Sequence, residues 1–189
     1  VAFVTGVFLL MAGAAPVAAQ RIVYVDDDAA ANGDGRSWIT AYRFLQDALA
    51  DAEAVGEPIE IRVAQGIYKP DRDRRNPDGG RDRNVSFRLS GGMSLLGGYA
   101  GIGADDPNRR DSETYQTVLS GDLLGNDAEV TDAAMMKDDP TRADNSSVMC
   151  VYGDGSRLDG CVITGGGSSF GALQILGNMT ISNCTFFAN

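Results

Sequence analysis

The chain has no histidine, few lysines, three cysteines and one tryptophan among its 189 residues. Without histidine, the side chain most often used for general acid–base catalysis is missing, which counts against an active site within this chain. The cysteines Cys150, Cys161 and Cys184 are odd in number, and their spacing matches no zinc-ligand pattern. Beyond residue 19 there is no long apolar run, so this part is not expected to cross a bilayer as a helix.

Acidic residues outnumber basic ones by 26 to 16, which gives a net charge of −10. Such a surface repels nucleic acid and anionic membranes, so neither is expected as a partner. The charge is compatible with solubility or with divalent cations. Apolar content is ordinary at 43%, which predicts a folded chain rather than a disordered one.

Residues 1–19 carry no charge and are almost entirely apolar or small. They end in Val17, Ala18 and Ala19, which are small residues of the kind found at signal-peptidase cleavage sites. We therefore expect a signal peptide cleaved before Gln20, and a secreted or outer-surface location for the rest. The alternative is a transmembrane anchor, against which the interior glycine and proline and the short length argue.

Residues 20–68 predict a strand, a helix and a second strand. The first strand is Arg21–Val25, and the second, at 59–63, alternates apolar and charged residues. Between them, Thr40 is a candidate N-cap and Gly56 a helix stop. The apolar residues at helical spacing are Phe44, Leu45, Ala48, Leu49 and Ala52.

Residues 69–147 combine short strands with long polar loops. Strands are expected at 85–89, 93–99 and 117–122, each next to a glycine or serine. The polar loops are at 69–84 and 100–116, and the first is longer than most connections. An acidic insertion follows at 123–145, with a partly helical stretch expected at 133–136.

The last segment, 148–189, contains two copies of one unit. Its first pieces superpose with a shift of 24 residues, and from Leu158 onward the shift is 23, which places Cys161 on Cys184 and Ile163 on Phe186. A period of 20 to 50 residues is typical of stacked repeats. We expect each strand to pair in parallel with its copy, so that the last strand is an open edge in this chain.

The repeat also predicts which side chains face inward. The turns are expected at Asp159–Gly160 and at Ser182–Asn183, with asparagine adopting the left-handed conformation. The thiols of Cys161 and Cys184 are expected to stack in adjacent copies; a disulfide is the alternative, although parallel Cβ directions disfavour it. The inward side chains are expected to be Leu158, Cys161 and Ile163 in the first copy and Ile181, Cys184 and Phe186 in the second.

These segments resemble a known family. The matching stretches are 26–28, 33–35, 37–38, 41–42, 45–49 and 63–68. Together they resemble the opening of secreted right-handed parallel β-helix proteins of the pectate-lyase-like superfamily. Residues 184–189 are similar to the F-x-x-N repeat of polymorphic outer-membrane proteins, with Phe186 and Asn189 at the two motif positions.

The resemblance implies an all-β fold, a right-handed parallel β-helix (β-solenoid) with an N-terminal strand–helix cap that is truncated at its C-terminus. The implied organisation is a signal peptide at 1–19, a cap at 20–68, first coils with polar insertions at 69–147, and regular coils at 148–189. The same superfamily includes lyases, hydrolases, adhesins and inert scaffolds, so the resemblance alone leaves the activity open.

Few residues are candidates for chemistry. A lyase of this type requires calcium-binding carboxylates near a basic residue, and a hydrolase requires clustered carboxylates. The candidates are Asp122, Asp154, Arg157 and Asp159. Arg157 and Asp159 could share a face, but the expected arrangement is an exposed ion pair beside a turn. No catalytic, cofactor-binding or metal-binding residue is therefore assigned.

The acidic loop from 26–28 to 32–35 has carboxylates and turn-forming glycines, which are suitable materials for a Ca²⁺ site. Its spacing is not that of an EF-hand, and no glutamate closes it. The alternative, which we favour, is a loop whose aspartates bind turn amides. No cofactor is expected, with Ca²⁺ the one candidate.

The sequence therefore favours a non-catalytic secreted or cell-surface repeat protein, acting as a scaffold, an adhesion module or a carbohydrate-contact module. Polysaccharide or cell-surface components are the expected partners. One alternative is a polysaccharide lyase or glycoside hydrolase whose active coils lie beyond Asn189. Another is an autotransporter passenger.

Overall fold

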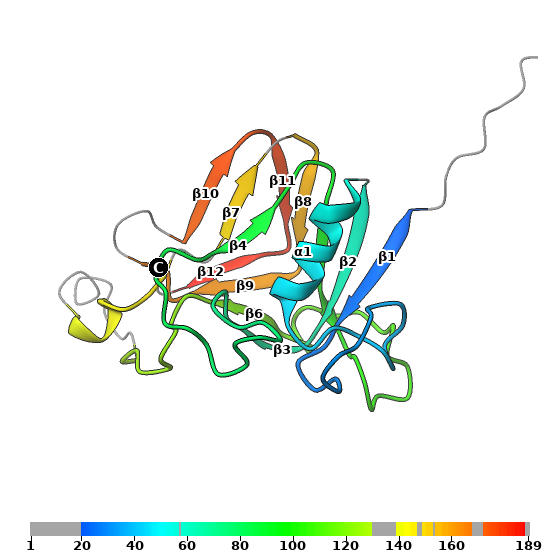
Figure 1. Cartoon of the computed structure of the whole chain (residues 1–189), viewed down its shortest axis with the longest axis horizontal. Helices are drawn as coiled ribbons and strands as arrows, with labels where there is room; N and C mark the ends of the chain where they lie inside the picture. The colour runs from blue at the N-terminus through cyan, green and yellow to red at the C-terminus, as the bar shows by residue number, and fades with distance from the viewer. Residues whose placement is uncertain are drawn as a thin grey trace, which may run out of the picture.

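A computed structural model describes residues 20–56, 58–129, 139–146, 149–152, 154–167 and 172–187. Within these residues the elements follow one another as short strands, with one α-helix near the start (Figure 1). In chain order they are β1 (Arg21–Val25), α1 (Leu45–Val55), β2 (Ile59–Ala64), β3 (Gly66–Tyr68), β4 (Phe87–Leu89), β5 (Ser94–Tyr99), β6 (Thr117–Ser120), the 3-10 helix η2 (Pro140–Arg142), β7 (Met149–Tyr152), β8 (Ser156–Asp159), β9 (Cys161–Thr164), β10 (Leu173–Leu176), β11 (Met179–Ser182) and β12 (Thr185–Phe187).

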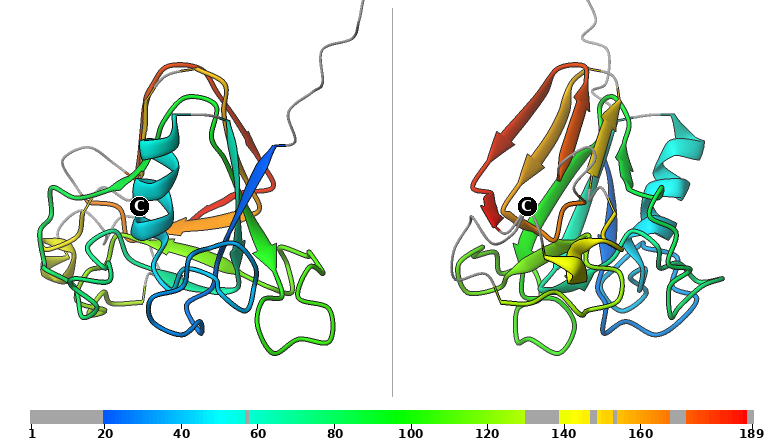
Figure 2. Two further views of the ribbon diagram at one scale, coloured as in Figure 1. Left: turned by 45° about the vertical axis from the view of Figure 1, so that its right-hand side comes forward. Right: turned by 90° about the vertical axis from the view of Figure 1, so that its left-hand side faces the viewer.

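The strands form three parallel sheets. Their orders are β1-β2-β5-β8-β11, β10-β7-β4 and β12-β9-β6-β3. Figure 2 shows the three sheets facing one interior, with α1 beside β4 and β2. A single buried cluster joins side chains from all three sheets, including Ile61, Phe87 and Ile163.

The helix belongs to this core. Its buried face consists of Leu45, Ala48, Leu49 and Ala52, and it packs against β4, β1 and β2. Gly56 ends it in the left-handed conformation, as predicted, with φ of 68° and its N–H donating to Ala52 O at 3.4 Å. The predicted N-cap was wrong: Phe44, not Thr40, holds that position, and its side chain makes no capping hydrogen bond.

The predicted fold class is corrected by this arrangement. The described chain is a mixed α/β assembly of short parallel strands with one core helix, not an all-β, right-handed parallel β-helix. The sheets hold five, three and four strands, and long loops separate β3 from β4 and β5 from β6. The helix, which was predicted as part of an N-terminal cap, contributes its own apolar face to the core shared by the sheets.

The pairing predicted for the last segment is confirmed. Leu158 pairs with Ile181 and Ile163 with Phe186, at the predicted shift of 23 residues. Strand β10 pairs with β7 at a shift of 24, with Ile175 opposite Val151. All of these pairings are parallel. The sequence therefore specified the register of six strands, because equivalent side chains must stack on one another.

The expected burial holds for the first copy only. Leu158, Cys161 and Ile163 are buried, whereas Ile181 is 38% exposed and Phe186 47% exposed. The difference arises because β10, β11 and β12 each lie at one end of their sheets. Among the described strands, β12 thus has a partner on one side only, as predicted. Cys161, which is buried, and Cys184, which is half-buried, have free thiols, as the favoured prediction had it.

Three smaller predictions have mixed outcomes. Strand β1 has the predicted bounds, but β3 was missed because Gly66 was interpreted only as a turn. The predicted signal peptide at 1–19 and the partly helical stretch at 133–136 lie outside the described residues. In the described part of the chain, no helix has the length and apolar character needed to cross a membrane.

Gly160 forms the turn between β8 and β9 and provides a test of this packing. Its φ is 74°, and a Cβ there would lie 2.9 Å from Gly97 O and 2.8 Å from Arg110 Nη2. Gly103 has φ of 85° but open space around it. We expect Gly160→Ala to lower the free energy of unfolding by about 3 kcal/mol, from left-handed strain plus crowding. Gly103→Ala should lower the free energy of unfolding by only about 1 kcal/mol, because it adds left-handed strain without crowding.

The measurement is urea denaturation monitored by circular dichroism. The unfolding free energies of the two variants are compared once their m-values are shown to agree. Equal losses in the two variants would show that the close approach of β5 and the 160 turn is not present in solution.

Candidate functional site: a cationic groove and a buried carboxylate

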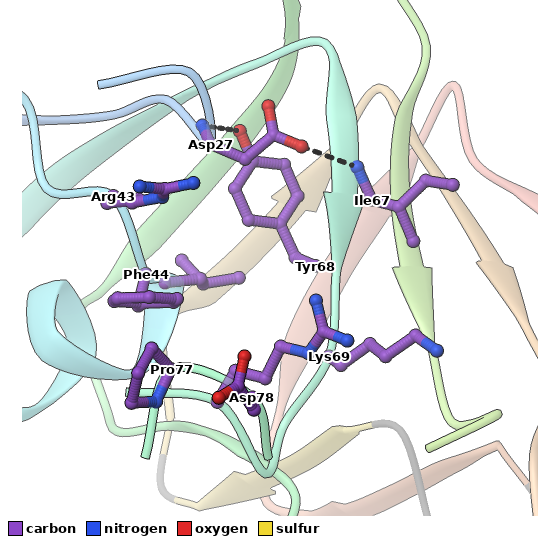
Figure 3. Close-up of a pocket in the computed structure, with 10 residues that line it drawn as sticks. Asp27, Arg43, Phe44, Ile67, Tyr68, Lys69, Pro77 and Asp78 are labelled. Carbon is purple, nitrogen blue, oxygen red and sulfur yellow. Dashed lines mark hydrogen bonds between the residues drawn. The ribbon is translucent and has the colours of Figure 1, made fainter. Parts of the chain in front are cut away.

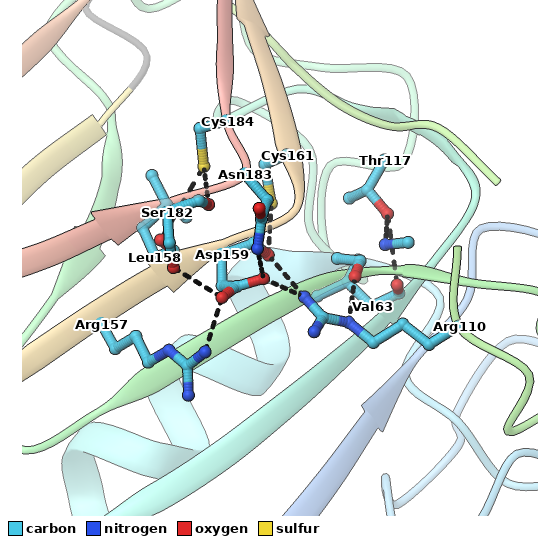
Figure 4. A network of polar contacts seen from close by, with 12 residues as sticks. Val63, Arg110, Thr117, Arg157, Leu158, Asp159, Cys161, Ser182, Asn183 and Cys184 are labelled. Atoms are coloured by element: carbon cyan, nitrogen blue, oxygen red, sulfur yellow. Dashed lines mark hydrogen bonds and ion pairs between the residues drawn. The ribbon is translucent and has the colours of Figure 1, made fainter. Parts of the chain in front are cut away.

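The carboxylate of Asp159 accepts hydrogen bonds from four side chains at a corner between two sheets (Figure 4). Asp159 ends β8, and its side chain is 2% exposed. Arg157 Nη2 donates to Oδ2 at 2.5 Å, and Arg110 Nη2 donates to Oδ1. From the neighbouring copy, Ser182 Oγ donates to Oδ2 at 2.6 Å and Asn183 Nδ2 donates to Oδ1 at 3.3 Å.

This network joins three segments that are far apart in sequence. Arg110 also donates from Nε to Gly97 O at 2.8 Å, so it links β5 to the 159 turn. Asn183 repeats that turn after β11, with φ of 50°, as predicted for an asparagine at this position. The predicted exposed Arg157–Asp159 ion pair is therefore wrong in one respect, because the carboxylate is buried.

Burial acts to raise the pKa of Asp159, but the hydrogen bonds from Ser182, Arg110, Arg157 and Asn183 outweigh it and hold the pKa well below its usual range. A carboxyl held so firmly as an anion cannot serve as a proton donor near neutral pH. Asp159 thus has a structural role.

The other two candidates, Asp122 and Asp154, have separate partners. Asp122 accepts hydrogen bonds from the backbone N–H groups of Gly125 at 2.6 Å and Asn126 at 3.1 Å. Asp154 accepts from Asn178 N at 2.8 Å, across to the next copy. In the described structure these side chains thus hold turns, and we assign neither of them to an acid–base pair.

The acidic loop after β1 is organised by backbone amides. Single oxygens of Asp26, Asp27 and Asp28 lie within 4.8 Å of one another. Asp26 Oδ2 accepts from Ile102 N at 2.6 Å, and Asp27 Oδ2 accepts from Ile67 N at 3.1 Å. Burial raises the pKa of both Asp26 and Asp27. The favoured alternative, aspartates that bind turn amides, is confirmed here.

A cavity of about 400 Å³ lies between the start of α1, strand β3 and the loop that follows it (Figure 3). The loop is fixed against the helix, because Gln46 Nε2 donates to Ser86 O at 3.2 Å and Arg74 N donates to Asp47 Oδ2 at 3.0 Å. The cavity is lined by Asp27, Arg43, Phe44, Leu45, Ile67, Tyr68, Lys69, Arg72, Pro77 and Asp78.

Two arginines in this cavity have no ion-pair partner in the described chain. The guanidinium of Arg43 lies 6.0 Å from the centre of the Phe44 ring and forms no ion pair. Arg72 Nε is buried and makes no hydrogen bond. Lys69 also lines this cavity. Its pKa is lowered mainly by burial and also by the positive charge of Arg72, although the negative charge of Asp122 acts to raise it. In so acidic a chain, unpaired cations in a cavity are conspicuous.

The cavity continues along the molecule. A second hollow of about 140 Å³ shares Arg43, Phe44 and Pro77 with it. A third, of about 440 Å³, shares Asp47 and Arg74 with the second. We call the three together the α1 groove. It is bordered by residues from the loop before α1, the first half of α1, strand β3 and the loop that follows β3.

Sequence reasoning did not identify the α1 groove. Its arginines come from two loops whose approach depends on contacts across the fold. The available signal was the unusual length of the 69–84 loop, which carries several arginines in an acidic chain.

No family model, curated protein or solved structure matches the chain. The predicted resemblance to the pectate-lyase-like superfamily, and to polymorphic outer-membrane repeats, is therefore overturned. The residues quoted for it occupy ordinary roles in this fold: 26–28 bind backbone amides, and 45–49 begin the core helix.

The Asp159 network predicts a specific pH dependence. Because the folded pKa is lower than the unfolded value, its stabilising effect is present above the unfolded pKa, near 4, and is lost as the pH falls toward the folded value. We expect Asp159→Asn to lower the free energy of unfolding by about 2–4 kcal/mol at pH 7. Thermal melts from pH 7 to pH 2 should show that this difference shrinks below pH 4.

The matched control is Asp106→Asn, at an exposed carboxylate that, within the described part of the chain, accepts a hydrogen bond from Asn108 N alone. It should follow the wild-type pH curve. A difference between wild type and Asp159→Asn that stays constant down to pH 2 would contradict the ionised network.

Proposed function

We propose that this protein is a non-catalytic binding module that contacts acidic polysaccharide through the α1 groove. The single observation that supports the proposal is the pair of arginines, Arg43 and Arg72, that have no ion-pair partner among the described residues. A buried guanidinium N–H without an acceptor costs roughly 1–3 kcal/mol, and a bound anion would remove that cost.

The chemistry of the groove suits a carboxylated sugar. Guanidinium groups bind carboxylates through paired N–H···O contacts, which favour arginine over lysine at such sites. Phe44 and Pro77 offer apolar faces beside these cations for the sugar ring (Figure 3). The uncapped start of α1 adds the positive end of the helix dipole.

The carboxylates around the groove support binding rather than catalysis. Asp27 accepts from Ile67 N, Asp47 from Arg74 N and Asp71 from Arg81 N, the last at 3.0 Å. Each therefore holds the backbone that shapes the groove. A glycosidase requires two carboxyl groups that face the scissile bond and exchange protons with it.

The proposed location follows from the same ligand. An acidic polysaccharide lies outside the cell, and the apolar segment 1–19 has the composition of an export signal. We therefore propose secretion or attachment to the outer cell surface.

The test compares two variants that differ in what each removes. Arg72→Met deletes the unpaired donor while it keeps an apolar stem, and Arg43→Met deletes the exposed cation. We expect each to weaken binding to polygalacturonate at least about tenfold, the loss of one charge-assisted contact. Arg72→Met should also leave the unliganded protein as stable as wild type or about 1 kcal/mol more stable.

Binding is measured by isothermal titration calorimetry, with dextran as the neutral polymer and Arg109→Met as the matched control at an exposed arginine outside the groove. Equal binding to dextran would show that the acidic groups of the polymer are not recognised, and equal weakening by Arg109→Met would show a non-specific charge effect; either result would refute the groove. Release of unsaturated or reducing ends from the polymer would instead establish an enzyme.

A further inference from the structure

The loop between β6 and β7 carries an unusual set of buried oxygens. Residues 139–146 (yellow in Figure 1) lie at the far side of the molecule from β1. Four side-chain oxygens in this loop are buried and make no hydrogen bond: Asp127 Oδ1, Asp144 Oδ1, Asn145 Oδ1 and Ser146 Oγ. Buried polar atoms are normally paired with protein or with an ordered ligand, so four in one loop require an explanation.

Two reciprocal contacts bring these side chains together. Asn145 Nδ2 donates to Asp127 Oδ2 at 2.9 Å. Asn126 Nδ2 donates to Asp144 Oδ2 at 3.3 Å. The segments 126–127 and 144–145 therefore lie side by side, and in each pair one carboxylate oxygen is bound while the other is left over.

Asn145 is the decisive residue. It is only 1% exposed, its amide nitrogen donates to Asp127, and its side-chain oxygen is buried without a hydrogen-bond donor in the described structure. Its backbone is fixed as well, because Arg83 Nε donates to Asn145 O at 3.3 Å. The side chain cannot turn outward without losing the contact with Asp127.

The charge around this cluster is negative. The described loop contributes the carboxylates of Asp122, Asp127, Asp139 and Asp144. One arginine, Arg142, lies among them, with Nη2 at 3.5 Å from Asp127 Oδ2. Asp127 also lines a cavity of about 170 Å³ together with Asp122, Glu129 and Arg142, so three carboxylates and one guanidinium border this hollow.

We propose that this loop binds a calcium ion through Asp127 Oδ1 and Asn145 Oδ1, with Asp144 and Ser146 as the neighbouring oxygen donors. Carboxylate, amide and hydroxyl oxygens, completed by water, are the ligands that Ca²⁺ takes in flexible geometry. Mg²⁺ requires near-octahedral geometry and retains its water, which suits a protein-lined site less well.

The test uses thermal unfolding of the whole 189-residue chain in EDTA, in about 10 mM calcium chloride and in about 10 mM magnesium chloride. Weak calcium modules have dissociation constants of roughly 0.1–1 mM. Calcium should therefore raise the Tm by about 3–10 °C, and magnesium by much less. Asp127→Asn should abolish the calcium shift.

Two further variants separate the explanations. Asn145→Asp replaces the amide with a second carboxylate, so it should lower the Tm in EDTA but give a larger calcium shift than wild type. Asp28→Asn alters the exposed member of the 26–28 group and should leave the shift unchanged. If the orphan oxygens hold only water, calcium will not stabilise the wild type, and Asn145→Asp will be destabilised without rescue.

Loss of the calcium shift in Asp28→Asn, with the shift retained in Asp127→Asn, would overturn the proposal and place the ion at the 26–28 loop. Equal shifts with calcium and magnesium in all variants would also overturn it, because they would report general screening of the acidic surface.

Discussion

The stacking of β8 and β11 at their common corner depends on one buried anion, the carboxylate of Asp159. Its Oδ1 accepts from Arg110 and from Asn183 of the next copy of the turn, and its Oδ2 accepts from Arg157 on the same strand and from Ser182 of the next copy. The backbone can turn there only because Gly160 and Asn183 adopt positive φ values of 74° and 50°. The carboxylate thus connects a turn that needs positive φ values to side chains distant in sequence. Because its hydrogen bonds form one network, they stabilise the corner cooperatively.

The same use of carboxylates recurs in the loops of this acidic chain. Asp26, Asp71, Asp111 and Asp122 each accept hydrogen bonds from backbone N–H groups in loops. Long loops between short strands leave many such donors without sheet partners, and aspartate is a compact acceptor for them. An acidic cluster in this chain is therefore no sign of a metal by itself. Asp127 and Asn145 differ from these carboxylates because each has a buried side-chain oxygen with no hydrogen-bond donor in the described structure.

The sequence predicted what depends on local or periodic patterns. The register of β10, β11 and β12 followed from the 23- and 24-residue shifts, and the turn at Asn183 followed from residue type. The burial of Asp159 did not, because Arg110, its partner, lies 49 residues away in a polar loop. The fold class was missed for a related reason: α1 was treated as a cap, whereas Leu45 and Leu49 complete the core shared by three sheets.

The α1 groove illustrates the limit most clearly. Gln46 and Asp47 bind the loop that follows β3, and these long-range contacts help to bring Arg72 into the same cavity as Arg43. The net charge of −10 opposes the approach of an acidic polymer over distances up to the Debye length. The proposed affinity of the groove for such a polymer would therefore have to come from short, desolvated guanidinium contacts. A calcium ion at the 127–145 pair would reduce the opposing charge, so the two proposed sites would act in the same direction although they share no residue.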